Sequence, residues 1–458
     1  MLSSLVDDDR GGGGDGASAP SSGSAPWVSY LESLAVFGMR PGLERVSALL
    51  DWLDRPQDAY RVIHVVGTNG KSSTTRYCEA LLGSHGWRSG AYLSPHIFGW
   101  NERVLVDGRP IAVELLGRCV ERVRSLVSRL PVAAGEATQF EVLTVAALLA
   151  LAESGAEAVV LEAGLGGRLD ATNVVEAPVV VLTNVALEHT QVLGATREEI
   201  FAEKAAVIKG GEAVFGELDG LEEEARRVCA AAGAHAHVLG RDFTVVGTPG
   251  DFIVSMPAEG GRWSGLALPT PALYQVANAG LAVAAVRLFL GGLDEAAVRQ
   301  ALNGVVVPGR FQQVGERPLV IADGAHNPEG VRALARSLAG PRMPKPLIGV
   351  LAIMRDKGYE EMLSSLLPLL DGVVCTQAGE ARSLSADELV AMVATNAAAA
   401  GRSGLVVAVE SDPHAALALA GKRAGAEGSV LIAGSLFLLE DLRDVLAPSI
   451  YLRETREG

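Results

Sequence analysis

The sequence predicts an α/β protein in which a mostly parallel sheet is flanked by helices. Short β-branched runs alternate with longer Ala- and Leu-rich stretches of helical periodicity along most of the 458 residues. Such alternation is typical of βαβ units, whose strands pair in parallel. The composition agrees with this class, because 49% of the residues are hydrophobic and 20% are charged, which is enough apolar surface for a sizeable core.

The N-terminal segment is different in character. Residues 1–25 are mainly Gly, Ser, Ala and Asp and contain almost nothing to bury, so we predict a disordered tail. The segment lacks the basic region and apolar core of a signal peptide, and no apolar run reaches the ~20 residues of a spanning helix. We therefore expect a cytoplasmic protein with no membrane partner.

Charge and cysteine content narrow the class further. The net charge of −15 argues against nucleic acid as a partner and favours small-molecule substrates. The four cysteines are far apart in the chain and form no C-x-x-C pattern. They indicate buried thiols in a reducing compartment and not a zinc site or a disulfide framework.

Residues 26–303 form the first predicted domain. Strands are expected at 62–66, 158–163 and 178–185, and helices from Ser72 and from Thr196 to Ile208. Glycines and prolines between Asn303 and Pro318 break regular structure, which predicts a linker at 304–318.

Residues 319–458 form the second predicted domain, of ordinary size for an α/β unit. Strands are expected at 319–322, 347–353, 372–376, 405–409 and 429–433. A helix should follow each strand, beginning at Pro328, Tyr359, Ala386, Pro413 and Leu436.

A glycine turn after the first strand carries the sharpest chemical signal. The run Val62-Ile-His-Val-Val-Gly-Thr-Asn-Gly-Lys-Ser-Ser joins a strand to a hydroxyl-rich helix start. In such a turn the backbone N–H groups of Gly67, Thr68, Asn69 and Gly70 can cradle phosphate, Lys71 can reach the outer phosphates, and Ser72 or Ser73 can face a magnesium ion. Val65 stands where the longer phosphate-loop pattern has glycine, so the match is to a shortened form. The alternative is an ordinary turn with an exposed lysine, which the flanking strand and helix disfavour.

Eight motifs in order then identify a family resemblance. They are Gly67–Lys71; Ser94-Pro95-His96 with Asn101-Glu102-Arg103; the run from Glu162 to Asn173; His189 with Leu193-Gly194; Glu203-Lys204-Ala205; Asn278-Ala279; Gly309-Arg310-Phe311; and the run from Asp323 to Pro328. From Trp27 to about Leu439 the chain resembles the folylpolyglutamate synthase/dihydrofolate synthase family of the Mur ligase superfamily. The resemblance implies a P-loop domain followed by a smaller Rossmann-like domain, with ATP in the cleft between them.

The resemblance also implies a magnesium site. Glu162 ends a predicted strand, where α/β sheets present ligand-binding groups, and the family pattern places Ser94, Glu162 and His189 around Mg²⁺. It implies a carbamylated Lys204 that helps to hold a second Mg²⁺. Taken alone, His189 is more typical of a loop hydrogen-bonder and Lys204 of a solvated helix lysine. Glu188 stands where the family usually has aspartate.

Further residues are assigned to ATP by the same resemblance. It implies that Asp323 holds the ribose, that His326 lies near the phosphates, that Arg310 reaches the nucleotide when the domains close, and that Asn278 contacts the adenine. Without the family, Asp323 and its neighbours are simply a strand-to-helix turn.

The pterin-bearing substrate is expected at three segments. The matching positions are Gly38, Met39, Arg40 and Pro41, then Thr138 and Phe140, then Leu169, Asp170 and Ala171. Phe140 can stack on a flat heteroaromatic ring, but it is equally a core-facing residue of its helix.

The sequence therefore predicts an ATP-dependent amide ligase that adds L-glutamate to dihydropteroate or to reduced folates through an acyl phosphate. The expected catalytic residues are Lys71, His189, Lys204, Arg310 and His326, with ATP and Mg²⁺ as cofactors and a monomer as the working form. One alternative is a paralogous ligase that joins another carboxylate to an amino acid. A nucleotide-binding regulatory protein without chemistry is a second alternative, which the joint presence of Lys71, Glu162, His189, Lys204 and Arg310 disfavours.

Overall fold

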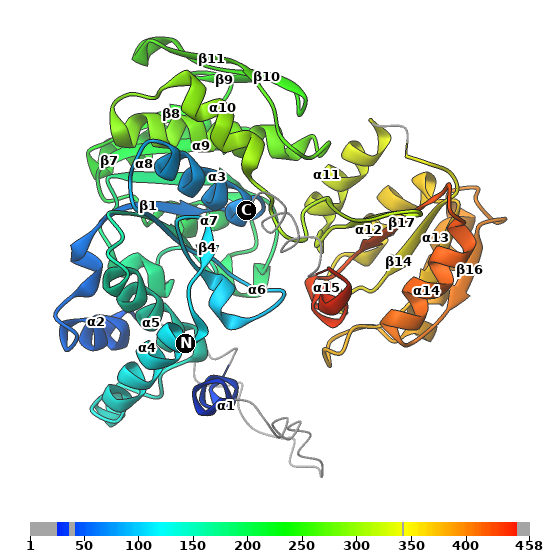
Figure 1. The fold of residues 1–458 in the computed structure, drawn as a ribbon, viewed down its shortest axis with the longest axis horizontal. Helices are drawn as coiled ribbons and strands as arrows, with labels where there is room; N and C mark the ends of the chain where they lie inside the picture. Colours follow the sequence, from blue (N-terminus) through cyan, green and yellow to red (C-terminus); the bar gives the residue numbers. More distant parts are fainter. Residues whose placement is uncertain (1–24, 36–41, 341–342, 447–458) are drawn as a thin grey trace, which may run out of the picture.

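A computed structural model describes residues 25–35, 42–340 and 343–446 and shows two α/β domains joined side by side (Figure 1). Most of the predicted tail, residues 1–24, and the predicted substrate residues Gly38, Met39, Arg40 and Pro41 lie outside the described residues. None of the helices in the described part of the chain is long and apolar enough to cross a membrane.

The N-terminal domain is built on an eight-stranded sheet of order β4-β3-β2-β5-β1-β6-β7-β8. Its strands are β1 (Arg61–Val66), β2 (Ser89–Tyr92), β3 (Val104–Val106), β4 (Arg109–Pro110), β5 (Ala158–Glu162), β6 (Val179–Asn184), β7 (Gly211–Glu217) and β8 (Ala234–Val238). The six strands from β2 to β8 in this order pair in parallel, and β3 and β4 add an antiparallel edge. The carboxyl ends of β1, β5 and β6 therefore meet at one edge of the sheet.

Helices cover both faces of this sheet because alternate strand residues point to opposite sides. Ile63 and Val65 of β1 pack on α3 (Lys71–Ser84), α9 (Tyr274–Leu290) and α10 (Glu295–Gly304), whereas Val62 packs towards the other face. That face is covered by α1 (Pro26–Ser33), α2 (Glu44–Asp51), α4 (Val113–Val127) and α5 (Gln139–Glu153). The helices α7 (Arg197–Ala205) and α8 (Glu222–Ala232) pack on β6 and β7.

The sequence analysis placed only the strands β1, β5 and β6 of this domain, so β2, β3, β4, β7 and β8 were not anticipated, nor were the two features described next. The strands β9 (Thr244–Thr248), β10 (Asp251–Met256) and β11 (Gly261–Leu266) form a separate antiparallel sheet that packs on α9 and α10 (Figure 1). The short helix α6 (Thr190–Leu193) follows β6 directly after His189.

The C-terminal domain has a six-stranded sheet of order β12-β13-β17-β14-β15-β16. The strands are β12 (Gln312–Glu316), β13 (Leu319–Ala322), β14 (Leu347–Leu351), β15 (Gly372–Cys375), β16 (Val406–Val409) and β17 (Ser429–Ala433). One face carries α11 (Pro328–Ala339), α12 (Tyr359–Leu366) and α13 (Ala386–Ala399), and the other carries α14 (Pro413–Ala424) and α15 (Leu436–Asp441). The predicted fold class, two α/β domains with mostly parallel sheets, is confirmed.

The segment predicted as a linker, 304–318, is not irregular throughout. Its residues Gln312–Glu316 form β12, which pairs antiparallel with β13, so the C-terminal sheet already begins at Gln312. The pairing is irregular between Gln313 and Gly315, where the glycine interrupts the strand pattern that sequence analysis relies on.

Candidate functional site

The turn after β1 requires its two glycines. Gly67 has φ +147° and Gly70 has φ +84°, both in the region that L side chains rarely adopt. A Cβ at Gly67 would collide with the Thr183 hydroxyl, and one at Gly70 would collide with the Asn278 amide oxygen. The sequence thus brings the backbone of this turn close to its neighbours.

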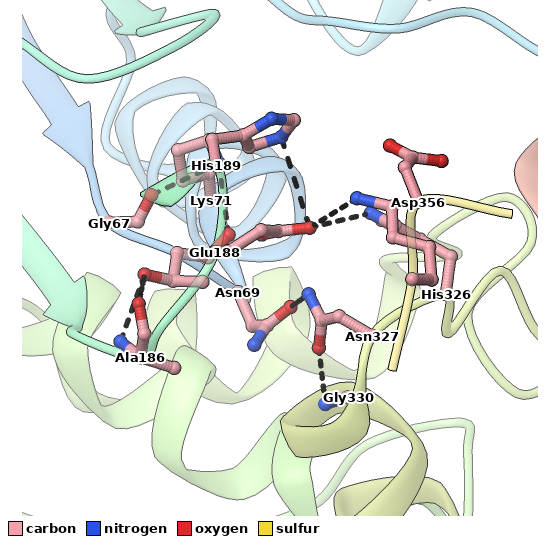
Figure 2. A network of polar contacts seen from close by, with 12 residues as sticks. Gly67, Asn69, Lys71, Ala186, Glu188, His189, His326, Asn327, Gly330 and Asp356 are labelled. Atoms are coloured by element: carbon pink, nitrogen blue, oxygen red, sulfur yellow. Dashed lines mark hydrogen bonds and ion pairs between the residues drawn. The ribbon is translucent and has the colours of Figure 1, made fainter. Parts of the chain in front are cut away.

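Strand β6 holds this turn in place. The N–H of Asn69 donates to Asn184 Oδ1 at 2.9 Å, and Thr68 N–H donates to the Asn184 carbonyl at 3.0 Å. The Thr183 hydroxyl donates to the Asn69 carbonyl at 2.6 Å. Lys71 begins α3 and folds over the turn, where its Nζ donates to the Gly67 and Thr68 carbonyls at 3.1 Å each (Figure 2 labels Lys71 and Gly67). The turn predicted to cradle phosphate is therefore hydrogen-bonded to β6 and has a lysine folded over it, and its binding of phosphate stays a prediction.

Glu162, at the carboxyl end of β5, lies directly beside this turn. Its Oε1 accepts a hydrogen bond from Ser72 Oγ at 2.8 Å, and its Oε2 accepts one from Ser94 N–H at 3.1 Å. The carboxylate is only 1% exposed, and burial raises its pKa although the Lys71 ammonium acts in the opposite direction. Of the two predicted hydroxyls, Ser72 faces Glu162, whereas Ser73 is buried.

This donor set fits a hard divalent cation. A buried carboxylate with a serine hydroxyl beside it supplies the oxygen ligands that Mg²⁺ and Mn²⁺ favour. Among the described residues no group of three His, Cys, Asp or Glu side chains could hold a metal by itself. Phosphate oxygens and water would have to complete the coordination, which is ordinary for Mg²⁺ in nucleotide sites.

His189, the third predicted metal residue, follows β6 in the left-handed conformation with φ +52°. Burial lowers its pKa, so the imidazole is neutral and able to ligate at neutral pH. Its Nε2 lies 3.9 Å from Glu188 Oε1. The structure joins Ser94 to Glu162 by a hydrogen bond and places His189 beside Glu188.

Lys204 is not the solvated helix lysine that a sequence without family context suggests. It is 3% exposed, and its Nζ donates to the Gly67 carbonyl at 2.9 Å. Burial, reinforced by the nearby Lys71 ammonium, lowers the pKa of Lys204 to about 7. The amine is therefore largely neutral at slightly alkaline pH, as addition to CO₂ requires.

Polar contacts tie the two domains together above the turn. Asn327 Nδ2 donates to Asn69 Oδ1 at 3.0 Å, and Lys357 Nζ donates to Glu188 Oε1 at 3.0 Å. His326 Nε2 lies 3.4 Å from the same Glu188 oxygen (Figure 2). Although burial opposes it, contact with His326 and Lys357 holds the pKa of Glu188 well below its usual range. The carboxylate that departs from the family's aspartate is thus ionised and engaged across the interface.

Asp323 is buried directly after β13, and its carboxylate accepts hydrogen bonds from other residues of the protein. Its Oδ2 accepts hydrogen bonds from Tyr274 Oη at 2.6 Å and from Phe311 N–H at 2.9 Å, and its Oδ1 accepts one from Ala325 N–H at 2.8 Å. Burial raises its pKa. Asp323 therefore ties the interdomain segment and α9 to the C-terminal sheet, and its predicted contact with ribose stays a prediction.

Arg310 and Asn278 reach the site from two sides. Arg310 lines a small cavity of about 30 Å³ between the domains, together with Ser72 and Glu102. Asn278 lies under the glycine turn, and its Nδ2 donates to Gln275 Oε1 at 3.2 Å. Both residues lie next to the predicted nucleotide site.

The predicted acceptor residues that the structure describes lie at the start of α5 and in the loop after β5. Thr138 caps α5, with its Oγ1 accepting from Glu141 N–H at 3.2 Å. Phe140 is half-buried against Gly164, and its ring centroid lies 6.2 Å from that of Tyr92. Its edge contact with the core does not exclude stacking on a substrate, so both interpretations stay open.

In the loop after β5, the Asp170 carboxylate accepts hydrogen bonds from neighbouring residues of the same segment. Its Oδ1 accepts from Thr172 N–H at 2.9 Å and from Thr172 Oγ1 at 2.5 Å, and its Oδ2 accepts from Leu165 N–H at 2.8 Å. Leu169 is 45% exposed, and Ala171 is buried. Arg168 and Leu169 are the exposed side chains of this loop, whereas Asp170 is buried and accepts hydrogen bonds within the loop.

Two residues at the site were missed by sequence reasoning. Lys357 follows β14 and Tyr274 begins α9. The rule that functional groups lie beyond the carboxyl ends of strands, which selected Glu162, could also have drawn attention to the loop after β14 that carries Lys357. Tyr274 has no comparable local signal, because its contact with Asp323 spans 49 residues.

The fold and the site together define the class of protein. A P-loop domain whose glycine turn faces a second α/β domain across polar contacts has the architecture of a Mur-type ligase. The family model of the Mur ligase middle domain matches residues 65–286, and that of the Mur ligase glutamate ligase domain matches residues 309–436.

Similar proteins identify the family within this class. Dihydrofolate synthase/folylpolyglutamate synthase of Mycobacterium tuberculosis is 36% identical over 76% of this chain and 77% of its own. The structure of M. tuberculosis folylpolyglutamate synthase complexed with ADP superposes with a TM-score of 0.84 at 31% identity, covering 92% of this chain and 97% of that one. A bifunctional folylpolyglutamate synthase/dihydrofolate synthase structure with Mn, AMPPNP and L-glutamate bound gives 0.79 at 30%, covering 92% and 97%.

The chain belongs to the folylpolyglutamate synthase/dihydrofolate synthase family. It is an ATP-dependent glutamate ligase of folate metabolism, and its cofactors are ATP and a divalent metal.

Proposed function

We propose that the chain joins the amine of L-glutamate to a pteroate-type carboxylate, either that of dihydropteroate or the γ-carboxylate of a reduced folate, with Mg²⁺ as the physiological ion. The observation that carries the proposal is the buried Glu162 carboxylate, hydrogen-bonded to Ser72 at 2.8 Å and set beside the glycine turn under Lys71. A carboxylate ligand and a phosphate cradle at one sheet edge suit phosphoryl transfer.

The reaction has two balanced steps. An acceptor carboxylate oxygen attacks the γ-phosphorus of ATP, the bond from that phosphorus to the β,γ-bridging oxygen breaks, and ADP leaves. The glutamate amine then attacks the acyl carbon, phosphate departs with the C–O electron pair, and the amine loses a proton. No side-chain nucleophile is needed, so the protein's task is positioning and charge stabilisation.

The residues divide these tasks between them. Lys71 supplies positive charge at the outer phosphates, and the turn backbone orients them. Glu162, Ser72, Ser94 and His189 are the groups that would hold the ion, which when bound neutralises phosphate charge. Arg310 reaches in from the interdomain segment, and a carbamylated Lys204 would offer a further carboxylate-like oxygen pair.

The acceptor assignment rests on Thr138, Phe140, Leu169, Asp170 and Ala171. Phe140 offers an aromatic face beside the loop that follows Glu162, and Leu169 is exposed at that loop. The four buried free cysteines support a reducing, cytoplasmic location. The working form proposed is a monomer, which light scattering in solution would check.

Glutamate-dependent phosphate release tests the proposal. Purified protein with ATP, Mg²⁺ and L-glutamate should turn over dihydropteroate or a reduced folate at least about tenfold faster than simple aromatic carboxylates, because a wrong acceptor leaves buried polar groups unpaired. ATP binding without a response to any pterin acceptor would favour the paralogous ligase. Replacing Mg²⁺ by EDTA should abolish turnover in either case.

A further inference from the structure

A charged contact between the two domains goes beyond the residues assigned to catalysis. We propose that Lys357 is a positioning residue for ligation, and that its ion pair with Glu188 is an interdomain latch that holds the C-terminal domain closed over the glycine turn. This proposal rests on the proposed ligase function, but closure of the two domains can be measured without any acceptor.

Glu188 and Lys357 both lie in short segments next to regular structure. Glu188 follows β6, the strand that also fixes the glycine turn. Lys357 sits in a tight turn, because its N–H donates to the Met354 carbonyl at 3.1 Å and its own carbonyl accepts from Tyr359 N–H at 2.8 Å. The chain therefore places the two side chains opposite one another without needing long loops.

The Lys357 turn is also packed on the segment that carries His326. A Cβ at Gly358 would lie 2.9 Å from Pro328 Cγ, so the turn rests on the first residue of α11. The turn that carries Lys357 therefore lies directly against the segment that carries His326. The ion pair thus fixes the position of a residue expected near the phosphates.

The contact is shielded from water. The side chains of Lys357 and Glu188 are 12% and 11% exposed, and their atoms lie 3.0 Å apart. Two imidazoles also lie within 4 Å of this carboxylate, His326 at 3.4 Å and His189 at 3.9 Å, and Lys204 interacts with it electrostatically. Two groups of the C-terminal domain therefore converge on one oxygen of the N-terminal domain, as Figure 2 shows for His326.

Such a pair suits a device that opens in every catalytic cycle. In the closed form the loss of hydration offsets part of the attraction between the two charges, so the pair favours closure only modestly, and opening returns both charges to water. Removing one partner is different, because it leaves the other charge shielded and uncompensated in the closed form. The loss therefore destabilises the closed arrangement of the two domains and not the fold of either domain. The neutral Asn69–Asn327 hydrogen bond at 3.0 Å holds the same interface but carries no such penalty.

The test compares Lys357→Met with a matched neighbour. Arg355→Met removes a cation two residues away whose ion pair with Glu388 is exposed and lies within the C-terminal domain. Small-angle scattering with AMPPNP and Mg²⁺ should give a larger radius of gyration for Lys357→Met than for the wild type or Arg355→Met. Turnover should fall about tenfold in Lys357→Met alone, with an unchanged melting temperature. Lys357→Arg, which keeps the positive charge, should have a radius of gyration and a turnover close to those of the wild type.

A double-mutant cycle completes the test. If the pair acts as a unit, Glu188→Gln/Lys357→Met should be no slower than the slower single variant. Multiplying losses, or a Lys357→Met variant with wild-type turnover and radius of gyration, would overturn the latch. The wild type could prove inactive with every acceptor while Lys357→Met still has the larger radius of gyration. That result would overturn the proposed acceptor and support the latch.

Discussion

At the scale of single residues, the site is built from charged groups that burial has shifted from their usual behaviour. Glu162 has a raised pKa and Lys204 a lowered one, and both shifts have desolvation as the leading cause. Each group is thereby made receptive: the carboxylate to a cation, and the amine to an electrophile such as CO₂.

Lys71 gives the most direct prediction at this scale. Lys71→Ala should lower glutamate-dependent phosphate release by about 10²-fold or more while the protein stays folded, because the lysine lies over the glycine turn and is proposed to supply charge to the transferring phosphoryl group. Circular dichroism checks the fold, and Lys345→Ala, which removes an exposed lysine of the C-terminal domain, is the control. Near-normal turnover of Lys71→Ala would refute the phosphate-cradle assignment.

Lys204 gives a pH-dependent prediction. Because the pKa is lowered to about 7, the neutral amine that reacts with CO₂ becomes the major form as the pH rises through that value. With ¹³C-bicarbonate, a carbamate signal in the NMR spectrum should grow from about pH 6 to about pH 8. Lys204→Met should lack this signal, and an equal signal in both proteins would assign it to another amine.

At the scale of elements, close contacts between loops and helices place these side chains. The loop after β5 packs against the end of α7, where Arg168 N–H donates to the Glu203 carbonyl at 2.9 Å. Helix α5, which carries Thr138 and Phe140, is fixed at its start by the capping box of Thr138 and Glu141.

Gly167 tests the first contact. A Cβ there would lie 2.7 Å from the Lys204 carbonyl oxygen and 2.9 Å from that of Glu203, which are backbone atoms that cannot move aside. Gly167→Ala should therefore lower the free energy of unfolding by about 1–3 kcal/mol in urea titrations and displace Lys204. Gly292→Ala is the control, because nothing lies within 4 Å of its added Cβ.

Arg45 tests the second contact. Its Nη2 donates to Glu141 Oε1 at 2.6 Å, and the two side chains are 4% and 10% exposed. Arg45→Met leaves the Glu141 carboxylate buried without its cation and should lower the free energy of unfolding by about 3–5 kcal/mol. The exposed pairs of Arg55 with Asp51 and Asp58 are the comparison, and Arg55→Met should cost less than about 1 kcal/mol.

At the scale of the whole molecule, the two domains meet through polar groups, with Asp323 anchoring the interdomain segment and Glu188 bridging to Lys357. An interface of this kind permits opening and closing, and product release from a closed site often limits turnover. The latch proposed above belongs to this scale.

The N-terminal tail gives a prediction for the whole chain. Deleting residues 1–24 should leave the melting temperature and turnover nearly unchanged, because this Gly- and Ser-rich segment has no apolar periodicity and no catalytic group. Ala25 is kept because its carbonyl accepts from Val28 N–H at the start of α1. A large loss of stability or activity would show that the tail docks on the folded domains.

Local patterns were sufficient for every strand of the C-terminal domain except β12 and for β1, β5 and β6 of the N-terminal domain. Strand β13 and the helix starts at Pro328 and Tyr359 agree with the sequence to the residue, because proline at a first helical turn and β-branched runs act over a few neighbouring residues. The glycine turn followed by Lys71 was likewise predictable, since conformation and chemistry lie within five consecutive residues.

Other features were decided by contacts between residues far apart in the chain. The burial of Lys204 depends on Gly67, 137 positions away, and the contact of Glu188 with Lys357 spans 169 positions. Strand β12 is defined by its pairing with β13 and has no clear pattern of its own. Asp170, predicted to contact the substrate, instead accepts hydrogen bonds from its own loop. By itself the sequence determined the α/β class and the alternation of strands and helices in the C-terminal domain, and it singled out the residues proposed to handle phosphate, because these are encoded in patterns of a few neighbouring residues. Only the tertiary structure decided which charges are buried and which domains they join, because desolvation and Coulomb attraction depend on distances in space and not along the chain.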